Sequence, residues 1–251
     1  MVGRRSVLTG LTGVGASAAF YAMPGPTTRA EQPDPSAVRE TIAVLGTGHF
    51  GGAIGKRLST IGYPVVYGSR TPDAPRVQTL VMESGPRASA ATQRDAVARG
   101  AIVVFGIPWE PVESMLPDLG NLAGKLLIDP MIAKPKIIEG YPFPPAVPTS
   151  TAEQLQSWVP GANVVKAFIT ISYGTLANPG RAAGPVTIPF AGTDRTAKER
   201  VARLISELGL EPIDAGPLVA SRYIENLLWY EVSCNRTNRK LFELYMRQVP
   251  L

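Results

Sequence analysis

The sequence has very little cysteine and histidine. Its 251 residues include one of each, Cys234 and His49. A single cysteine excludes a disulfide within the chain. Together with a single histidine, it also argues against a zinc site, which draws mainly on those two residue types. We therefore expect a site without metal ligands and a fold without covalent cross-links.

Runs of basic residues and long apolar runs are also missing, although the formal net charge is +5. Without basic runs or alternating basic and aromatic residues, we expect no nucleic-acid partner beyond loose electrostatics. A membrane span needs about 20 strongly apolar residues, and the nearest candidate, Leu8 to Ala22, is shorter and diluted by small polar residues. The length and the 45% of hydrophobic residues instead suit one α/β domain, or a domain with a small annex.

The stretch Thr41 to Gly55 carries the clearest motif. An apolar run ends in Gly46-Thr-Gly48-His-Phe-Gly51, a G-x-G-x-x-G pattern, and a helical pattern follows it. The first glycine permits a tight turn, the second lets the backbone approach a pyrophosphate, and the third lets the helix pack on the strand. A second strand, residues 64–67, follows at βαβ spacing. We therefore predict a dinucleotide site. His49 is more simply a loop side chain facing dinucleotide or solvent than a proton-transfer group.

The end of that second strand selects the cofactor. An NAD site usually has an acid about twenty residues past the glycines, where it binds the ribose 2′-hydroxyl. Gly68 stands in that place here, and Ser69 and Arg70 follow it. A hydroxyl and a guanidinium bind a 2′-phosphate that a carboxylate would repel. The sequence predicts NADP over NAD, with a solvated Arg70 as the alternative.

The N-terminus resembles a twin-arginine export signal, here residues 1–22, with Arg4 and Arg5 before a mildly apolar segment. Residues 23–37 are proline-rich and predict an extended linker. This route carries folded proteins, so we expect NADP(H) to be bound before export to the periplasm. The alternative is an ordinary N-terminus on a cytoplasmic protein.

Strand and helix patterns alternate through the rest of the chain. Apolar runs predict strands, and Ala101 to Gly106 is typical of one buried on both faces. The expected strands cover residues 101–106, 125–129, 163–168 and 186–191, and residues 211–217 predict a short strand and a turn. The expected helices cover residues 75–83, 88–98, 150–158, 194–208 and 218–242. Pro189 suggests an edge or irregular strand. Residues 133–148 predict a long loop, functional or mobile.

Several segments together resemble a known family, the NADPH-dependent reductases of the deazaflavin coenzyme F-420, in the wider group related to the N-terminal part of pyrroline-5-carboxylate reductase. The resemblance spans about Thr41 to Asn235. Its motifs are Gly46-Thr-Gly48 with Gly51, Gly68-Ser-Arg70, Ile107-Pro-Trp-Glu110, Lys166-Ala-Phe168 with Thr170-Ile171, and Asp214-Ala-Gly-Pro-Leu218 with Ser221-Arg222 and Glu225. Ile169, the leader and the proline-rich segments depart from the family pattern and leave the acceptor in doubt.

The resemblance implies an α/β Rossmann fold, a doubly wound and mostly parallel sheet over residues 38–216 with a short C-terminal helical extension, residues 217–251. It implies NADP(H) on the glycine loop with Ser69 and Arg70 at the 2′-phosphate, and an acceptor pocket beside the nicotinamide. The cofactor residues are Gly46, Thr47, Gly48, His49, Phe50, Gly51, Ser69, Arg70, Ile107, Pro108 and Trp109. The pocket residues are Pro130, Phe168, Thr170, Ile171 and Asp214. From the strand position alone, Trp109 is either floor under the nicotinamide or an anchor for the next helix.

The expected activity is hydride transfer between NADP(H) and a small redox acceptor, a deazaflavin such as coenzyme F-420 or a related ring. Such transfer depends on orientation, so we assign no catalytic side chain. The alternatives are an imine or carbonyl reductase, which usually has a longer helical C-terminal domain, and a non-catalytic NADP sensor. Lys166 is either structural or in contact with substrate. The apolar C-terminal helix is either core or the contact of a homodimer.

Overall fold

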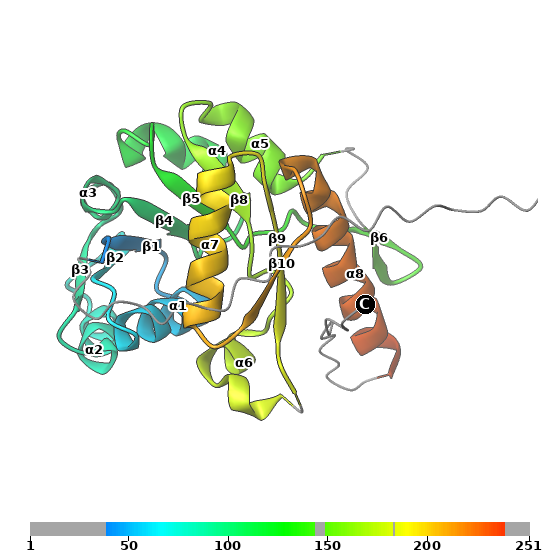
Figure 1. The fold of residues 1–251 in the computed structure, drawn as a ribbon, viewed down its shortest axis with the longest axis horizontal. Helices are drawn as coiled ribbons and strands as arrows, with labels where there is room; N and C mark the ends of the chain where they lie inside the picture. The colour runs from blue at the N-terminus through cyan, green and yellow to red at the C-terminus, as the bar shows by residue number, and fades with distance from the viewer. Residues whose placement is uncertain (1–38, 144–148, 183, 239–251) are drawn as a thin grey trace, which may run out of the picture. The chain divides into compact units, whose positions relative to one another are not determined.

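The computed structural model describes residues 39–143, 149–182 and 184–238. Within these ranges, eight strands form one sheet in the order β10-β9-β8-β5-β4-β1-β2-β3, seen in Figure 1. The leader and the proline-rich linker lie outside the described residues. The strands of the sheet are β1 Ile42–Leu45, β2 Val65–Ser69, β3 Ala88–Thr92, β4 Ile102–Phe105, β5 Leu126–Asp129, β8 Asn163–Lys166, β9 Thr187–Gly192 and β10 Glu211–Asp214.

All neighbouring strands in this sheet are parallel except β8 and β9. The predicted doubly wound, mostly parallel sheet is confirmed. The chain moves from β1 outward to β2 and β3, then returns to β4 on the other side of β1 and continues to β5 and β8. This reversal of direction beside β1 is where open α/β sheets bind their ligands, at the carboxyl ends of the strands.

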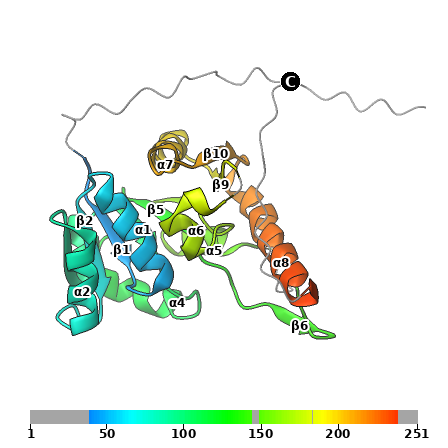
Figure 2. The ribbon, with the colours of Figure 1, turned by 90° about the horizontal axis from the view of Figure 1, so that it is seen from below.

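Helices cover both faces of the sheet (Figures 1 and 2). They are α1 His49–Thr60, α2 Pro75–Ser84, α3 Gln93–Arg99, α4 Val112–Met115, α5 Thr151–Trp158, α6 Tyr173–Ala177, α7 Arg195–Glu207 and α8 Ser221–Asn238, with short 3₁₀ turns η1 Leu116–Leu119, η2 Pro179–Arg181 and η3 Leu218–Ala220. Side chains from α1, α6 and α7 share one core cluster, and those from α3 and α5 share another. The clusters lie on opposite sheet faces, because Ile42 and Val44 join the first while Ala43 and Leu45 join the second.

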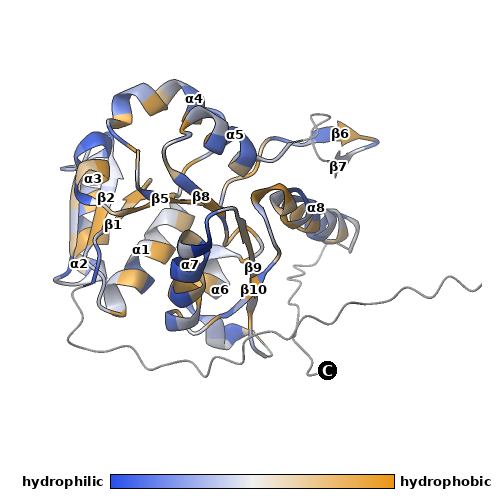
Figure 3. Cartoon of the chain, turned by 45° about the horizontal axis from the view of Figure 1, so that its top comes forward, coloured by the Kyte–Doolittle hydropathy of each residue, from blue (hydrophilic) through white to orange (hydrophobic). Residues whose placement is uncertain are grey.

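The apolar pattern explains this arrangement. Every residue of β1, β4 and β5 is buried, as expected for central parallel strands covered on both sides. On α7, Val201, Leu204 and Ile205 are buried, and the residues on the opposite face of the helix are polar. These polar residues appear blue in Figure 3. The predicted caps are confirmed as well: the Asp194 carboxylate accepts from the Ala197 N–H at 2.7 Å at the start of α7.

Two predicted elements are wrong. Residues 88–98 are not one helix, because Ala88–Thr92 pairs with β2 as strand β3 and only Gln93–Arg99 is helical, with Thr92 as the N-cap. Alanine and serine favour a helix locally, but the open edge of β2 offers backbone hydrogen bonds that decide the outcome. The expected long loop contains an antiparallel hairpin, β6 Lys136–Ile138 and β7 Tyr141–Phe143; its last residues, 144–148, lie outside the described residues.

Pro189 does not mark an edge strand, since β9 lies between β8 and β10. The ladder between β8 and β9 includes only Ala191 and Gly192 of β9, so it stops short of the proline. A missing N–H at Pro189 therefore costs no bond to β8.

The C-terminal helix α8 packs on the sheet rather than standing apart. Ile224 is buried with Ile169 and Ala191, and Leu228 packs against this group. The helix also lies beside β7. This apolar face therefore belongs to the core, which is one of the two predicted roles. The expected helical residues after 238 lie outside the described residues. Among the residues that the structure describes, no helix has both the length and the apolar character required to cross a bilayer.

Candidate active site at the carboxyl edge of the sheet

The glycine loop after β1 is fixed by backbone contacts. Gly46 has φ +98°, and a Cβ there would lie 2.3 Å from the carbonyl oxygen of Gly106. A Cβ on Gly51 would lie 2.3 Å from the carbonyl oxygen of Gly46. Gly48 differs, because a Cβ there would meet no described atom within 4 Å. The first and third glycines therefore lock the loop, while the second leaves space in front of it.

Helix α1 begins at this open space. Gly48 is its N-cap and has no side chain to bond the free N–H groups of the first turn. Those groups and the positive end of the helix dipole favour an anion at this point. The loop therefore has the shape and the polarity that a pyrophosphate requires.

Side chains of the loop reach in different directions. His49 stacks on Tyr173 of α6, with ring centroids 4.8 Å apart and an interplanar angle of 22°. The Thr47 hydroxyl accepts a hydrogen bond of 3.4 Å from Nη1 of Arg76 on α2. Phe50 packs partly against the core. The two exposed contacts thus tie the glycine loop to α6 on one side and to α2 on the other.

The end of β2 has no room for an acid. A Cβ on Gly68 would already lie 2.7 Å from Cδ2 of Leu45, so this position is closed to larger side chains. Ser69 is buried, and its hydroxyl accepts from the Thr71 N–H at 3.2 Å. Arg70 is exposed and forms no hydrogen bond or ion pair with another described residue. Its guanidinium is free to bind a phosphate.

The segment after β4 runs past the glycine loop. The Ile107 side chain lies against Gly46, since a Cβ on that glycine would be 2.8 Å from Cγ2 of Ile107. Pro108 is exposed. Trp109 is half-buried and stacks on Trp158 of α5, with centroids 5.0 Å apart and an angle of 13°. The ring therefore anchors this segment to α5 and not to the next helix, α4, as the anchor interpretation had it, and its contact with the cofactor stays a prediction.

The segment after β8 carries most of the predicted pocket residues. Phe168 is 1% exposed and has φ +66°, a left-handed conformation that is unfavourable for a bulky residue and often occurs at functional sites. The Thr170 hydroxyl is buried and has no hydrogen-bond partner among the described residues. Ile171 is 5% exposed and joins the core with Phe168, while Pro130, at the end of β5, is half-buried. Thr170 is therefore the residue of this segment with an unused polar atom.

Asp214 is engaged elsewhere. Its carboxylate accepts from Lys198 Nζ of α7 at 3.0 and 2.8 Å and from the Gly216 N–H at 2.9 Å. The turn interpretation of this aspartate is thus visible in the structure. A role in the pocket stays a prediction, and the exposed ion pair competes with it.

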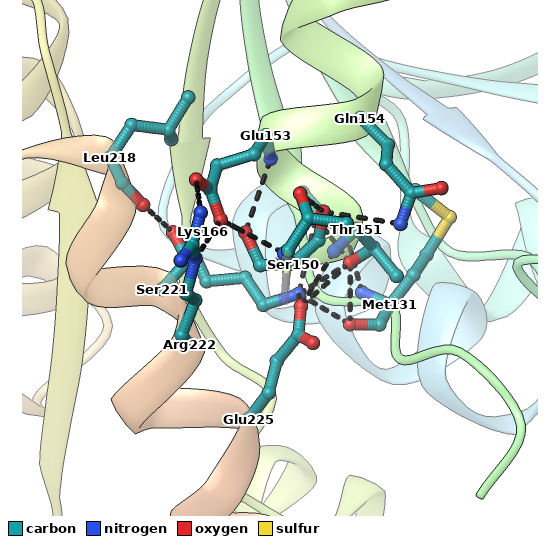
Figure 4. Close-up of polar contacts among 12 residues, drawn as sticks. Met131, Ser150, Thr151, Glu153, Gln154, Lys166, Leu218, Ser221, Arg222 and Glu225 are labelled. Carbon is teal, nitrogen blue, oxygen red and sulfur yellow. Dashed lines mark hydrogen bonds and ion pairs between the residues drawn. The ribbon is translucent and has the colours of Figure 1, made fainter. Parts of the chain in front are cut away.

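A buried cluster of charges lies at the carboxyl ends of β5 and β8 (Figure 4). The Lys166 side chain is fully buried. Its Nζ lies 3.1 Å from Oδ2 of Asp129 and 2.7 Å from Oε1 of Glu225 on α8, and it donates to the Thr151 hydroxyl at 2.7 Å and the Met131 carbonyl at 2.5 Å. Lys166 is therefore structural, as one of the two predictions had it, because no donor is left for a substrate.

A second ion pair reinforces this cluster. Ser150 and Glu153 form the predicted capping box at the start of α5. Arg222 of α8 grips the same Glu153 carboxylate through Nε at 2.8 Å and Nη2 at 2.7 Å. Burial alone would raise the pKa of Glu153, but the bonds from Arg222 and Ser150 hold it below its usual value. One ion pair, Arg222 with Glu153, therefore fastens α8 to the start of α5, and a second, Glu225 with Lys166, fastens α8 to the end of β8.

Comparison with known proteins identifies the family. Residues 41–133 match the family model of coenzyme F420-dependent NADP oxidoreductases. A solved structure from Arthrobacter sp. FB24, named as a candidate F420-dependent NADP reductase, is 31% identical, with a TM-score of 0.74 over 83% of this chain and 100% of that chain. The chain belongs to this family. It is an NADP-dependent oxidoreductase.

Other similar proteins extend the group. The metalloreductase STEAP2 of Homo sapiens is 33% identical over 189 residues, which are 74% of this chain and 35% of that protein. The oxidoreductase therefore spans about a third of the length of the curated relatives it matches. An imine reductase from Myxococcus stipitatus shares the fold, with a TM-score of 0.61 over 80% of this chain and 64% of that chain, at 18% identity.

The residues present fit NADP(H). The open space at Gly48, the uncapped first turn of α1 and the exposed Arg70 offer a phosphate cradle, and no described acid stands at the end of β2 to repel a 2′-phosphate. Sequence reasoning missed three features of this oxidoreductase: Gly106, which packs against Gly46 and Gly51; the Tyr173 ring; and the links from α8. Gly106 stands at the end of an apolar run, so its place after a buried strand could be predicted from the sequence. The others join distant segments and carry no local signal.

Proposed function

We propose that this oxidoreductase transfers a hydride between NADP(H) and a flavin-like ring, with a deazaflavin of the coenzyme F-420 type as the leading acceptor. When bound, NADPH supplies the hydride from its nicotinamide ring. The glycine loop would hold the pyrophosphate, and Ser69 with Arg70 the 2′-phosphate. The segments after β5 and β8, with Pro130 and Thr170, would position the acceptor.

The observation that carries this proposal is that the ionisable groups at the ends of β5 and β8 are already paired within the fold. Asp129 and Glu225 are buried, and each is paired with the buried Lys166. Reduction of an imine or carbonyl needs a proton for nitrogen or oxygen as well as a hydride for carbon. Hydride addition to a flavin-like ring gives a reduced anion whose charge the ring delocalises, and solvent can supply the proton afterwards. The transfer itself then needs only orientation and exclusion of water. The site therefore favours the ring over the imine or carbonyl alternative.

The likeness to a metalloreductase suggests a second acceptor class. A hydride carries two electrons, whereas a metal ion such as Fe³⁺ accepts one electron at a time. A carrier that takes a hydride and releases single electrons would have to stand between them, and flavins do both. Metal reduction would therefore use the same first step, hydride transfer to a flavin, and the metal ion would be the terminal substrate.

The test is NADPH oxidation, followed at the nicotinamide absorbance, with one acceptor at a time. We expect repeated turnover with coenzyme F-420, or with a flavin, and turnover with a ferric chelate only when a flavin is also present. Turnover with a cyclic imine or a ketone alone would overturn the proposal. Oxidation of no more than one NADPH per chain with every acceptor would do the same.

We propose further that the N-terminal residues 1–22 direct export with NADP(H) already bound. The supporting observation is the pair Arg4 and Arg5 before a mildly apolar segment. Replacing both arginines by lysine should retain the protein in the cytoplasm, as measured by cell fractionation. Protein purified from the periplasm should carry NADP(H) at about one per chain by mass spectrometry. An exported but empty protein would contradict loading before export.

A homodimer is a separate proposal. Tyr223 and Tyr230, seven residues apart on α8, are 77% and 61% exposed, which leaves an aromatic surface on that helix. Light scattering of the purified chain should give twice the monomer mass. A monomer at micromolar concentration would contradict this proposal.

A further inference from the structure

Arg76 reaches the glycine loop from a helix that sequence reasoning did not connect with the cofactor. It is the second residue of α2 and lies six positions after Arg70. Its Nη1 lies 3.4 Å from the Thr47 hydroxyl, in the loop between Gly46 and Gly48. The guanidinium therefore lies beside the phosphate loop, although its helix follows β2.

The start of α2 is held firmly in this place. The Ala74 N–H donates to the Thr71 carbonyl at 3.1 Å, and the Val77 N–H donates to the Ala74 carbonyl at 2.8 Å. Pro75 occupies the first helical position, where its fixed φ suits a helix start. Val77 is fully buried and anchors the turn. The backbone thus directs Arg76 toward Thr47 without help from a ligand.

The charge of Arg76 is not neutralised by an acid in the described part of the chain. No ion pair there includes Arg76 or Arg70, and Asp73, which stands between them in the sequence, pairs with neither. The hydrogen-bond partner of Arg76 is the neutral hydroxyl of Thr47, which leaves further N–H groups of the guanidinium for an anion. Two exposed guanidinium groups from one short segment therefore offer a phosphate more donors than either does alone.

We propose that Arg76 is a second phosphate-binding residue of the NADP site, acting with Arg70 and favouring the 2′-phosphate. The inference rests on the NADP dependence of this oxidoreductase and deepens it, because it names a residue that sets the preference for NADP over NAD. A planar guanidinium bonds phosphate oxygens in pairs, which a lysine ammonium cannot do. The position beside Thr47 fits a residue that bridges the glycine loop and the end of β2.

The test measures the dissociation constants of NADPH and NADH by calorimetry for the wild type, Arg76→Gln and Arg76→Lys. We expect Arg76→Gln to weaken NADPH about tenfold and NADH less than about twofold. Arg76→Lys should recover only part of the NADPH affinity. The NADPH affinity of Arg76→Gln should also fall less steeply with added salt, because one cation fewer is screened.

Arg203→Gln is the matched control, since Arg203 is an exposed arginine of α7 with the same change of charge. It should bind both cofactors as the wild type does. The thermal midpoints of all variants should agree, because Arg76 is exposed and contributes no core contact.

The 2′-phosphate and the pyrophosphate of NADP can be tested separately. Adenosine 2′,5′-bisphosphate and ADP serve as probes, since only the first carries a 2′-phosphate. Equal weakening of both probes by Arg76→Gln would overturn the preference for the 2′-phosphate, because ADP lacks that group. Unchanged affinity for NADPH and for both probes would overturn the inference. Because no acceptor enters these measurements, failure of the proposed acceptor would leave this result intact.

Discussion

The two halves of the carboxyl edge are held together by different forces. In the cofactor half, Gly46, Gly51 and Gly106 touch backbone to backbone, and the exposed Arg70 and Arg76 have no carboxylate partner among the described residues. In the half proposed for the acceptor, here called the acceptor half, the buried carboxylates of Asp129 on β5 and Glu225 on α8 meet the ammonium group of Lys166 on β8. The first half leaves polar groups available for a ligand. The second pairs its buried charges within the fold and leaves the Thr170 hydroxyl without a partner among the described residues.

This difference assigns ligand binding to the polar groups of the cofactor half and stabilisation of the fold to those of the acceptor half. A phosphate needs donors that the protein leaves open, so the cofactor half keeps uncapped N–H groups and free guanidinium groups. The acceptor half must hold the exits of β5 and β8 and helix α8 in fixed positions, and buried ion pairs with full hydrogen bonding achieve this. Substitutions in the two halves should therefore change different quantities, either cofactor affinity or the free energy of unfolding.

The largest effect is expected at Lys166. Replacing it with methionine keeps the volume but leaves Asp129 and Glu225 buried without their cation. Such a change costs about 3–5 kcal/mol of unfolding free energy. Urea unfolding followed by circular dichroism measures it.

Lys198→Met is the control for this prediction. It breaks an ion pair whose side chains are 19% and 49% exposed, and exposed pairs contribute about 1 kcal/mol or less. Equal losses for the two variants would show that burial of the charges around Lys166 does not stabilise the acceptor half.

Two glycines of the same loop have different expected roles within the cofactor half. Gly51 fixes the structure of the loop, and Gly48 leaves space for the cofactor. Gly51→Ala places a methyl group 2.3 Å from the Gly46 carbonyl oxygen, and the backbone cannot yield easily. We expect a loss of about 3 kcal/mol in unfolding free energy and of NADPH binding. Gly48→Ala meets no described atom within 4 Å and has φ −79°, so stability should stay as in the wild type while NADPH binding weakens.

Thermal unfolding and NADPH titration distinguish these outcomes. A Gly48→Ala variant that binds NADPH normally would show that the open space in front of the loop is not used by the cofactor. A stable Gly51→Ala variant would show that the loop can move away from α1.

The cofactor half could be read from the sequence because its determinants are local. The glycine spacing, the missing acid at Gly68 and the caps at Ser150 and Asp194 each lie within a few residues of the structure they specify. The strand β3 could not be read this way, because residues 88–92 are alanine and serine apart from Thr92, and their strand conformation comes from pairing with the edge of β2.

The acceptor half could be read only in part. Lys166 and Glu225 belong to two of the motifs that carry the family resemblance, yet neither motif predicts that the two side chains form an ion pair. Their contact links residues 59 positions apart and depends on where α8 packs. The partner of Trp109, Trp158, is likewise set by the packing of α5. Long-range pairs of this kind follow from the tertiary fold and not from spacing.

Arg70→Ala tests the open charges of the cofactor half. Loss of one charge-assisted contact should weaken NADPH binding by about 1.5–3 kcal/mol and leave NADH nearly unchanged. The unfolding free energy without cofactor should stay the same, since Arg70 has no partner among the described residues. Equal weakening of the two cofactors would remove Arg70 from the 2′-phosphate.

The smallest expected effect is a loss of folding stability at high pH, and it involves a buried tyrosine of β2 in the cofactor half. Tyr67 of β2 is fully buried, and its hydroxyl lies 2.8 Å from Oγ of Ser84. Burial raises its pKa from 10.0 to about 12, although the bond with Ser84 lowers it slightly. Between these values the unfolded chain loses the phenolic proton while the folded chain keeps it. Folding stability is therefore intact below pH 10 and falls as pH rises toward 12, by about 1.4 kcal/mol per pH unit.

Tyr67→Phe should remove this part of the slope but not all of it. Burial and the neighbouring Glu207 also raise the pKa of Tyr63 to about 12, so a second tyrosine contributes in the same pH range. Urea unfolding at pH 9, 10 and 11 should show a shallower decline for Tyr67→Phe and for Tyr63→Phe than for the wild type. An unchanged decline in Tyr67→Phe would mean that the folded chain opens around β2 before Tyr67 ionises. Local loosening around β2 would then limit the stability of the cofactor half at high pH.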